Sequence, residues 1–367
     1  MSQYRLVFTV TNDLTYDQRM QRICSTLAEA GYPVMLVGCT LPRSVVLGPQ
    51  PFQQCRLPCV FTKGFLFYAE YNVRLWWWLM LHPFDVVCSI DYDSLPGGCT
   101  AALLRGKKRV FDAHEYFTEV PEVVNRPFVR SVWSIVAFLF VRFYHRAYTV
   151  GPALARLFEK QFGMPFETIR NVPLLQELPS DSRSENNKNR VLLYQGALNE
   201  GRGIEYLLGA MCHIEHAELW LAGEGDLSEA LRDKCNALHV QQKVRFLGFV
   251  QPKDLKELTK QAFIGLNLLE SRGLSYYYSL ANKFFDYVQA GVPVVTMRFP
   301  EYEALCREHE VALLLDQLTE DQLVKALQQL LNDTALYEKL RQNCLTARHF
   351  WTWEAEKHKL IRLYDTL

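Results

Sequence analysis

The 367-residue sequence lacks several features that would assign it to other classes of protein. It carries no net charge, because 40 basic residues balance 40 acidic ones, which argues against a general nucleic-acid binder. It has no run of about 18 charge-free apolar residues, the length that a membrane-spanning helix needs. Its first residues lack the basic start and long apolar run of a secretory signal peptide. With 49% hydrophobic and 22% charged residues, the composition is that of a folded globular protein.

Paired cysteine motifs are also missing. The ten cysteines are scattered, no Cys-x-x-Cys occurs, and Cys55 and Cys59 have no second pair or histidine cluster that could complete a zinc site. A dinucleotide fingerprint is missing too, because Ser228 takes the place of its third glycine after Ala222–Asp226. We therefore expect buried, reduced thiols in a cytoplasmic protein, with no metal and no nicotinamide cofactor.

What the sequence does contain is two series of alternating strand and helix patterns. The first series has apolar strand candidates at 6–10, 34–37, 85–90 and 109–111, and the second has them at 191–194, 219–222, 244–246, 264–269 and 294–297. The most polar stretch, residues 176–190, lies between the two series. We predict an α/β protein of two doubly wound, Rossmann-like domains, residues 1–175 and 191–349, which face each other across a cleft.

A glycine-rich turn follows the strand at 191–194. Gly196, Gly201 and Gly203 allow the backbone to approach a ligand closely, and Arg202 offers a permanent cation that fits phosphate oxygens. The alternative is a plain glycine-rich turn with a solvated arginine.

A second turn that suits an anion opens the segment 279–295. Ser279 or Asn282 can cap a helix there, and free N–H groups at a helix start attract phosphate. Asn282 and Asp286 are four residues apart, so they share a face, and Asp286 could bind a ribose diol one turn below the phosphate. The alternative is a capped amphipathic helix with one buried acid.

Two acidic motifs follow strands in the first half. His114, in Asp112–Glu115, lies where the sites of α/β proteins form, although a single histidine can also be structural. Asp91 and Asp93 resemble the metal-binding pair of another fold, but we expect no divalent metal there.

Residues 128–146 are apolar almost all round and are flanked by arginines, and residues 71–80 form a second aromatic and basic stretch. We expect these segments to pack in the core, because helices that are apolar all round are usually buried. The alternative is an interfacial surface that meets a lipid-linked acceptor at the inner face of the membrane.

The second half resembles the retaining glycosyltransferases of family 4, which have the GT-B fold. The matching motifs are YQGALNEGRG, LWLAGEGDL, VRFLGFVQPKDL and NKFFDYVQAGVPVV, in the order of the family. The first half is similar to a bacterial subgroup through TNDLTYDQRMQR, CSIDYDSLPG, FDAHEYF and IRNVP. The resemblance implies a sugar-nucleotide donor, UDP- or GDP-linked, and a last segment, 350–367, that crosses back to the N-terminal domain.

The resemblance also implies roles for particular residues. Arg202 corresponds to a phosphate-binding lysine of the family. Ala197 stands where the family has a second phosphate-binding cation, an arginine, and Lys283 or Arg272 would have to supply that missing charge. Asp286 corresponds to the ribose-binding acid of the family, and Tyr278 takes the place of its other acid. Further donor contacts are expected from Gly196, Glu270, Ser279 and Asn282. His114 corresponds to the histidine near the reacting sugar, and Thr11, Asn12 and Asp13 replace a glycine-rich loop.

The implied reaction is transfer of a sugar, with retention of configuration, to a glycan or lipid-linked acceptor in cell-surface polysaccharide synthesis. Arg202 and Lys283 would stabilise the leaving diphosphate in place of a metal, and His114 would position and polarise. Ala197 and Tyr278 leave open a catalytically inactive binding protein. A sugar-nucleotide epimerase of the same architecture is the third reading.

Overall fold

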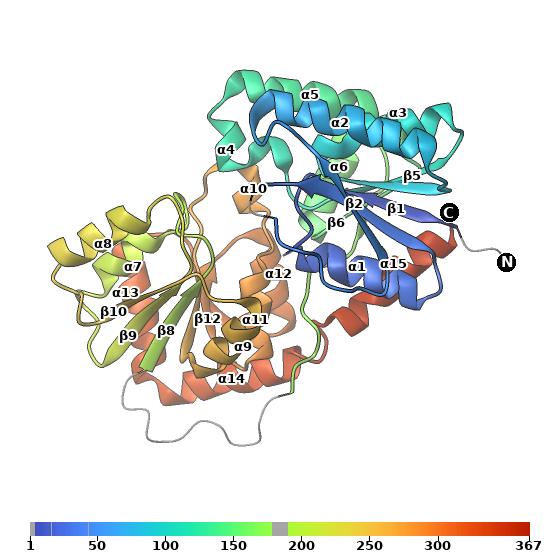
Figure 1. The fold of residues 1–367 in the computed structure, drawn as a ribbon. Coiled ribbons are helices and arrows are strands. Elements are labelled where there is room, and N and C mark those ends of the chain that lie inside the picture. Colours follow the sequence, from blue (N-terminus) through green and yellow to red (C-terminus); the bar gives the residue numbers. More distant parts are fainter. Residues whose placement is uncertain (1–3, 16, 43, 178–189) are drawn as a thin grey trace. The chain divides into compact units, whose positions relative to one another are not determined.

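The computed structural model describes residues 4–15, 17–42, 44–177 and 190–367. The chain divides into two compact units, each of which is described by itself (Figure 1). Unit 1 comprises Met1–Asn171 and Glu356–Leu367, and unit 2 comprises Val172–Ala355. Most of the expected linker, residues 178–189, lies outside the described residues, and Arg190 already begins a strand.

Unit 1 is built on a seven-stranded parallel sheet with the order β3-β2-β1-β4-β5-β6-β7. Its strands are β1 (Leu6–Thr9), β2 (Val34–Thr40), β3 (Gln53–Pro58), β4 (Val86–Ile90), β5 (Lys108–Ala113), β6 (Arg146–Thr149) and β7 (Glu167–Thr168). Its helices are α1 (Gln18–Glu29), α2 (Gly64–Leu81), α3 (Leu95–Leu104), α4 (Pro121–Val124), α5 (Pro127–Phe140) and α6 (Pro152–Phe162). The strand order reverses between β1 and β4, so ligands are expected beyond the carboxyl ends of these strands.

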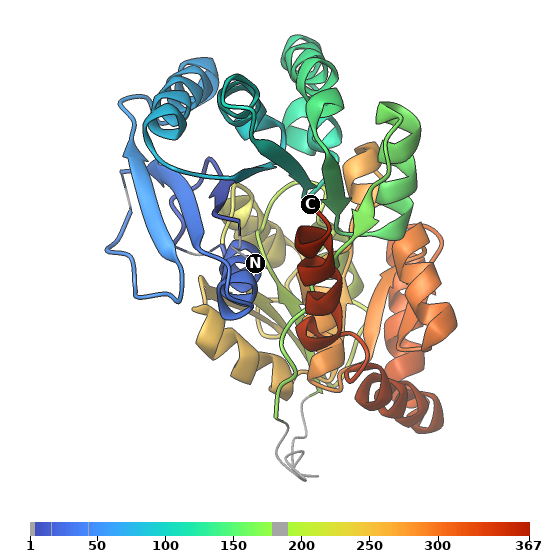
Figure 2. The same ribbon diagram turned by 90° about the vertical axis from the view of Figure 1, so that its right-hand side faces the viewer.

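Helices cover both faces of this sheet (Figures 1 and 2). Helices α2, α3 and α5 lie side by side on one face, whereas α1 and the last helix, α15 (Trp353–Asp365), lie on the other. Tyr364 of α15 is fully buried, with its ring 5.8 Å from the ring of Phe8 in β1. The C-terminal residues therefore complete the core of unit 1.

Unit 2 is built on a six-stranded parallel sheet with the order β10-β9-β8-β11-β12-β13. Its strands are β8 (Arg190–Gln195), β9 (Ala217–Ala222), β10 (Val244–Gly248), β11 (Ile264–Asn267), β12 (Val294–Met297) and β13 (Ala312–Leu315). Its helices are α7 (Ile204–Ala210), α8 (Ser228–Ala237), α9 (Pro252–Gln261), α10 (Gly273–Tyr277), α11 (Asn282–Gln289), α12 (Pro300–Glu308), α13 (Glu320–Asn332) and α14 (Thr334–Ala347). Here the order reverses between β8 and β11.

Both sheets are entirely parallel and doubly wound, so the predicted α/β class with two Rossmann-like halves is confirmed. Strands β11 and β12 are buried along their whole length, as expected for strands covered on both faces. Strands β3, β6 and β7 escaped prediction because they are short or partly exposed and carry no clear apolar run. Strand β13 was missed although Ala312–Leu315 is apolar throughout.

The expectation that residues 128–146 pack in the core is wrong. Helix α5 buries only Trp133 and Ala137, while Phe128 is 82% exposed and Phe138 is 68% exposed. Helix α5 lies at the edge of the helix layer that covers the sheet, and it packs mainly against α3. Only one narrow side of the helix is therefore buried. Its other apolar side chains remain at the surface.

Candidate functional site

The glycine-rich turn of unit 2 runs from the end of β8 to α7. Gly196 has a φ of 130°, which side-chain-bearing residues rarely adopt. A Cβ atom placed on Gly196 would lie 3.4 Å from Nζ of Lys283, a residue in the first turn of α11. The positive φ, rather than a lack of space, therefore accounts for the glycine, and the β8 turn lies beside the start of α11.

Two basic side chains lie at this turn, and neither pairs with a carboxylate among the described residues. The Nζ atom of Lys283 lies 3.9 Å from the ring centroid of Tyr194, and the guanidinium carbon of Arg202 lies 4.9 Å from that of Tyr276. Lys283 is only 9% exposed, and its Nζ atom has no hydrogen-bond partner among the described residues. The Nε atom of Arg202 is also buried without a partner there. Such groups are costly to bury without a partner, and an anionic ligand is the kind of group that could supply one.

The electrostatics of Lys283 agree with this geometry. Burial, and then the neighbouring charge of Arg202, hold the pKa of Lys283 well below its ordinary value. Glu205 lies near Tyr194, yet it forms no ion pair with either cation in the part of the chain that the structure describes. An anion bound beside Lys283 would restore its charge.

The predicted cap of α11 is wrong. The helix begins at Asn282, its N-cap residue is Ala281, and no side chain caps it. Ser279 instead lies in the preceding turn, with its hydroxyl 3.5 Å from Oη of Tyr302, which accepts a hydrogen bond from the N–H of Ala281 at 3.0 Å. Tyr302 therefore fixes the entry of the chain into α11. The first N–H groups of an α-helix have no intrahelical acceptor, and here no described side chain caps them.

Asp286 lies one turn further along α11. Its Oδ2 accepts a hydrogen bond of 3.1 Å from Nε2 of Gln195, and the hydroxyl of Thr259 donates to Oε1 of Gln195 at 2.8 Å. The carboxylate is thus held in a fixed position at the end of β8. This orientation suits a carboxylate that accepts hydrogen bonds from a diol.

The other expected donor contacts lie further along the loops. The N–H of Glu270 donates to the carbonyl of Gly201 at 2.9 Å, which ties the segment after β11 to the glycine turn. The carboxylate of Glu270 pairs with Arg272, which also pairs with Glu200. Tyr278 ends α10 with its ring 5.1 Å from that of Tyr277, and no described contact joins it to Lys283.

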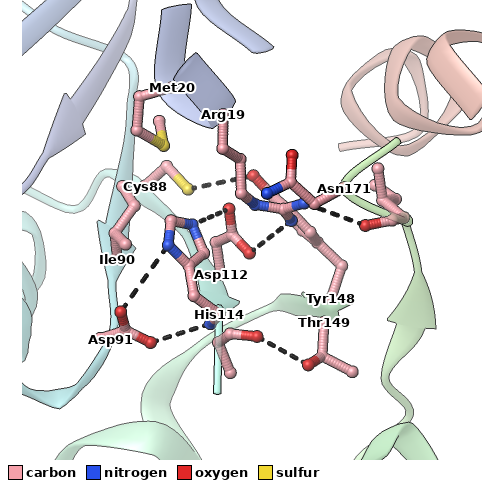
Figure 3. Close-up of polar contacts among 12 residues, drawn as sticks. Arg19, Met20, Cys88, Ile90, Asp91, Asp112, His114, Tyr148, Thr149 and Asn171 are labelled. Carbon is pink, nitrogen blue, oxygen red and sulfur yellow. Dashed lines mark hydrogen bonds and ion pairs between the residues drawn. The ribbon is translucent and has the colours of Figure 1, made fainter. Parts of the chain in front are cut away.

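The site of unit 1 surrounds His114, directly after β5 (Figure 3). Its Nε2 lies 3.0 Å from Oδ2 of Asp112, and the other oxygen of Asp112 forms a 3.0 Å ion pair with Arg19. Its Nδ1 lies 3.8 Å from Asp91, which also accepts the N–H of His114 at 2.8 Å. Asp91 has a φ of 51°, an uncommon conformation outside glycine that often marks functional sites.

The carboxylates determine the charge of His114. Burial opposes the imidazolium, but Asp112 and Asp91 outweigh it and raise the pKa of His114 to about 9. Burial would raise the pKa of Asp112, but Arg19 and His114 hold it below its ordinary value. For Asp91, burial is the larger influence and raises the pKa to about 8. At neutral pH, His114 is therefore a cation with one side toward solvent.

The predicted loop residues have different positions. Thr11 donates a hydrogen bond to Asp93, so it adjoins the acidic motif after β4. Asn12 donates to Asp17 at 2.7 Å, and Asp13 lies 3.9 Å from Arg56, so both stabilise the loop itself. No group of three or more potential metal ligands is found in the described part of the chain.

Sequence reasoning missed the partners of His114. Arg19 and Asp112 are buried, and both carry a signal in the sequence. Arg19 shares the apolar face of α1 with Ile23 and Leu27 at intervals of four residues, and Asp112 interrupts the apolar strand β5. A charged residue in an apolar stripe usually has a buried partner, and each of these is the other's partner.

Two family models match consecutive parts of the chain. One, described as "Glycosyltransferase Family 4", matches residues 18–174, and the other, described as "Glycosyl transferases group 1", matches residues 189–333. Together they include both sites.

Curated relatives match shorter stretches. An uncharacterised glycosyltransferase of Methanocaldococcus jannaschii is 38% identical over 111 residues, 29% of this chain and 26% of the relative. The lipopolysaccharide core biosynthesis glycosyltransferase LpsE of Rhizobium meliloti is 24% identical over 152 residues, 41% of this chain and 42% of the relative. The chain thus matches less than half the length of either relative.

Solved structures match the whole chain. Sucrose-phosphate synthase from Thermosynechococcus elongatus has a TM-score of 0.80 and 16% identity, with 99% of both chains covered. HepE from Anabaena, in complex with UDP-glucose, has a TM-score of 0.79 and 16% identity, with 99% of this chain and 100% of HepE covered. At these identities the likeness is one of fold.

Proposed function

We propose that this chain, which belongs to the family 4-type glycosyltransferases, transfers a sugar from a nucleoside-diphosphate donor to a glycan or lipid-linked acceptor with retention of configuration. The observation that carries the proposal is the pair of basic groups at the β8 turn, the buried Lys283 and the half-buried Arg202, neither of which pairs with a carboxylate among the described residues. A diphosphate has the charge and the acceptor oxygens that these groups lack.

Lys283 is our choice for the cation that replaces the family's missing arginine at Ala197. Arg272, the other candidate, is already neutralised by Glu200 and Glu270 and lies at the surface. Lys283 is buried, has no partner among the described residues and adjoins Gly196. The phosphate-binding charge has thus moved from the β8 turn to the first turn of α11.

We assign the remaining donor contacts by chemistry. Asp286, held by Gln195, accepts the ribose hydroxyls, and the free N–H groups at the start of α11 add dipolar attraction for the diphosphate. The bound UDP-glucose of HepE supports a UDP-linked sugar as the donor for this chain. Tyr278 replaces an acidic donor contact with a hydroxyl.

The proposed reaction breaks the bond between the anomeric carbon and the diphosphate oxygen, which keeps the electron pair. The acceptor oxygen bonds to the same face of that carbon, and its proton passes to the leaving phosphate. Arg202 and Lys283 stabilise the charge that develops on the diphosphate. His114, a cation paired with Asp112, positions and polarises a hydroxyl of the donor sugar.

The test starts with a thermal-shift screen against UDP-, GDP-, ADP- and dTDP-sugars. A bound donor at 100 times its Kd adds about 2.7 kcal/mol, which is easily detected. Transfer of labelled sugar to extracted glycan and lipid acceptors then separates a transferase from a binding protein. Incubation with the donor alone detects an epimerase, which needs no acceptor.

Variants connect the activity to the site. Arg202→Ala is expected to lower both donor affinity and turnover, and Asp286→Asn mainly donor affinity, by roughly ten- to hundredfold each. His114→Ala should reduce turnover with little change in nucleotide affinity. Arg307→Ala, which removes an exposed arginine of α12, is the control. If Arg202→Ala binds nucleotide and turns over like wild type, the phosphate site is wrongly placed.

A further inference from the structure

The outer surface of α2, α3 and α5 is unusually rich in exposed apolar side chains. Among the described residues, 22 large apolar side chains are exposed, and twelve of them lie on these three helices and the turn after α5. They are Phe65, Leu66, Val73, Trp77, Leu81, Leu103, Leu104, Phe128, Ile135, Phe138, Leu139 and Phe143. We call this surface the α2–α5 face.

The face is one continuous layer of unit 1 (Figures 1 and 2). Helix α3 packs against both α2 and α5, and the ring of Tyr68 in α2 meets that of Trp133 in α5 at 5.0 Å. In α2, Phe67, Tyr71, Leu75 and Leu79 point inward, so the exposed residues lie on the opposite side of the helix. The apolar residues are thus an organised outer stripe rather than scattered exceptions.

Most charges at the α5 side of this face are positive, and the one acid of α2, Glu70, pairs with Arg74. Residues 124–146 contain four arginines and no acid, although the whole chain has no net charge. Arg126, Arg142 and Arg146 are exposed and form no ion pair within the described residues, while Arg130 pairs with Glu119. Helix α3 has no charged residue. An apolar surface bordered by unneutralised arginines attracts a partner that is both apolar and anionic.

We propose that the α2–α5 face docks peripherally on an anionic lipid bilayer. Aromatic and aliphatic side chains would enter the interfacial layer, while Arg126, Arg142 and Arg146 would contact the lipid phosphates. In the described residues, no helix combines the length and apolar character that crossing a bilayer takes, so the contact is a surface one. The docking stands independently of the proposed transfer reaction, because it uses none of the residues of the two candidate sites.

Co-sedimentation of the full chain with vesicles tests the proposal. Wild type is expected to bind vesicles of equal parts phosphatidylcholine and phosphatidylglycerol, to bind pure phosphatidylcholine much less, and to dissociate at high salt. The double substitution Arg142→Ala/Arg146→Ala should weaken binding about 25-fold, roughly fivefold per arginine. Phe128→Ser/Phe138→Ser should also abolish most binding. Equal binding to both vesicle types would overturn the proposal.

Matched controls separate docking from damage to the protein. Phe249→Ser/Phe350→Ser removes two exposed aromatic residues from unit 2 and should leave vesicle binding unchanged. Brominated acyl chains should quench wild type more than Trp77→Phe, because Trp77 is exposed on the face. If the Phe128/Phe138 variant instead converts a dimer into a monomer without lipid, the face binds a second copy of the chain and the proposal fails.

Discussion

The two units treat buried charge in opposite ways. In unit 1, Arg19, Asp112 and His114 alternate in sign, and each contact in this row is 3.0 Å long. In unit 2, Arg202 and Lys283 adjoin each other, and no carboxylate pairs with either one in the described part of the chain. The charges of unit 1 are paired with one another, whereas the basic groups of unit 2 have no acidic partner among the described residues and await, in our proposal, the diphosphate of the donor.

This difference moves the two pKa values in opposite directions. The carboxylates around His114 raise its pKa to about 9 despite burial, while burial and Arg202 lower that of Lys283. Both groups lie beyond the carboxyl ends of parallel strands, so the fold alone does not decide their charge. The neighbouring residues decide it: carboxylates keep His114 charged, whereas burial and Arg202 favour the neutral form of Lys283 until, in our proposal, a phosphate binds.

The largest expected effect comes from breaking the charge row of unit 1. Arg19→Met leaves Asp112 buried beside His114 without its second cation, and loss of one partner from a buried pair costs about 3–5 kcal/mol. Urea unfolding, followed by alkylation of the buried Cys24 and Cys88, reports this loss for unit 1. Labelling of Cys235 and Cys344 in unit 2 is the internal control. An unchanged midpoint for Cys24 and Cys88 would contradict a stabilising row.

The matched substitution in unit 2, Lys283→Met, should stabilise the protein when no ligand is bound, whereas Arg19→Met destabilises unit 1. It removes an unpartnered buried nitrogen, so the unfolding free energy should rise by about 1–3 kcal/mol. The same change should weaken nucleotide binding about ten- to hundredfold, because a charge-assisted contact is lost. Calorimetry with the nucleoside diphosphate and urea midpoints of Cys235 and Cys344 measure both effects. Loss of stability and unchanged affinity would show that Lys283 is structural.

The sequence predicted much of the fold and part of each site. Long apolar runs and helical spacing located most strands of both sheets, and the glycine turn with Arg202 was visible as a local motif. The ion pair between Arg19 and Asp112 could not be predicted from a local motif, because the two residues are 93 positions apart. The exposure of α5 was also missed, since an apolar helix gives no sign of whether another element covers it.

The opposite pKa shifts predict opposite pH dependence for the two units between about pH 6.5 and 9. Above pH 6.5, folded unit 1 keeps a proton on His114 that the unfolded chain loses, so its stability should fall as pH rises toward 9. Asp91, whose pKa burial raises to about 8, acts in the same direction. Folded unit 2 holds fewer protons on Lys283 than the unfolded chain, so its stability without ligand should rise with pH.

Urea midpoints from the two pairs of buried cysteines, measured at several pH values, resolve the two slopes. Each slope of urea midpoint against pH has its own control variant. His114→Gln should make the slope of unit 1 shallower, and Lys283→Met should do the same for unit 2. Saturating donor should also flatten the slope of unit 2, since bound phosphate keeps Lys283 protonated. If the stability of both units changed with pH in the same direction, the predicted opposite pH dependence would be wrong.

The smallest expected effect tests the rival cation, Arg272. Its guanidinium is about half exposed and already pairs with Glu200 and Glu270, so an arriving phosphate would have to compete with two carboxylates. Exposed ion pairs contribute roughly 0–1 kcal/mol, so Arg272→Ala should change the free energy of unfolding by about 1 kcal/mol or less and the nucleotide affinity by less than about fivefold. Comparison of this variant with Lys283→Met tests what phosphate binding requires. Either any positive charge near the glycine turn contributes, or only a charge without an acidic partner does. A tenfold or larger loss of affinity in Arg272→Ala would mean that the site recruits a cation from an existing pair. The contrast between a complete site in unit 1 and an incomplete one in unit 2 would then no longer explain how the diphosphate is bound.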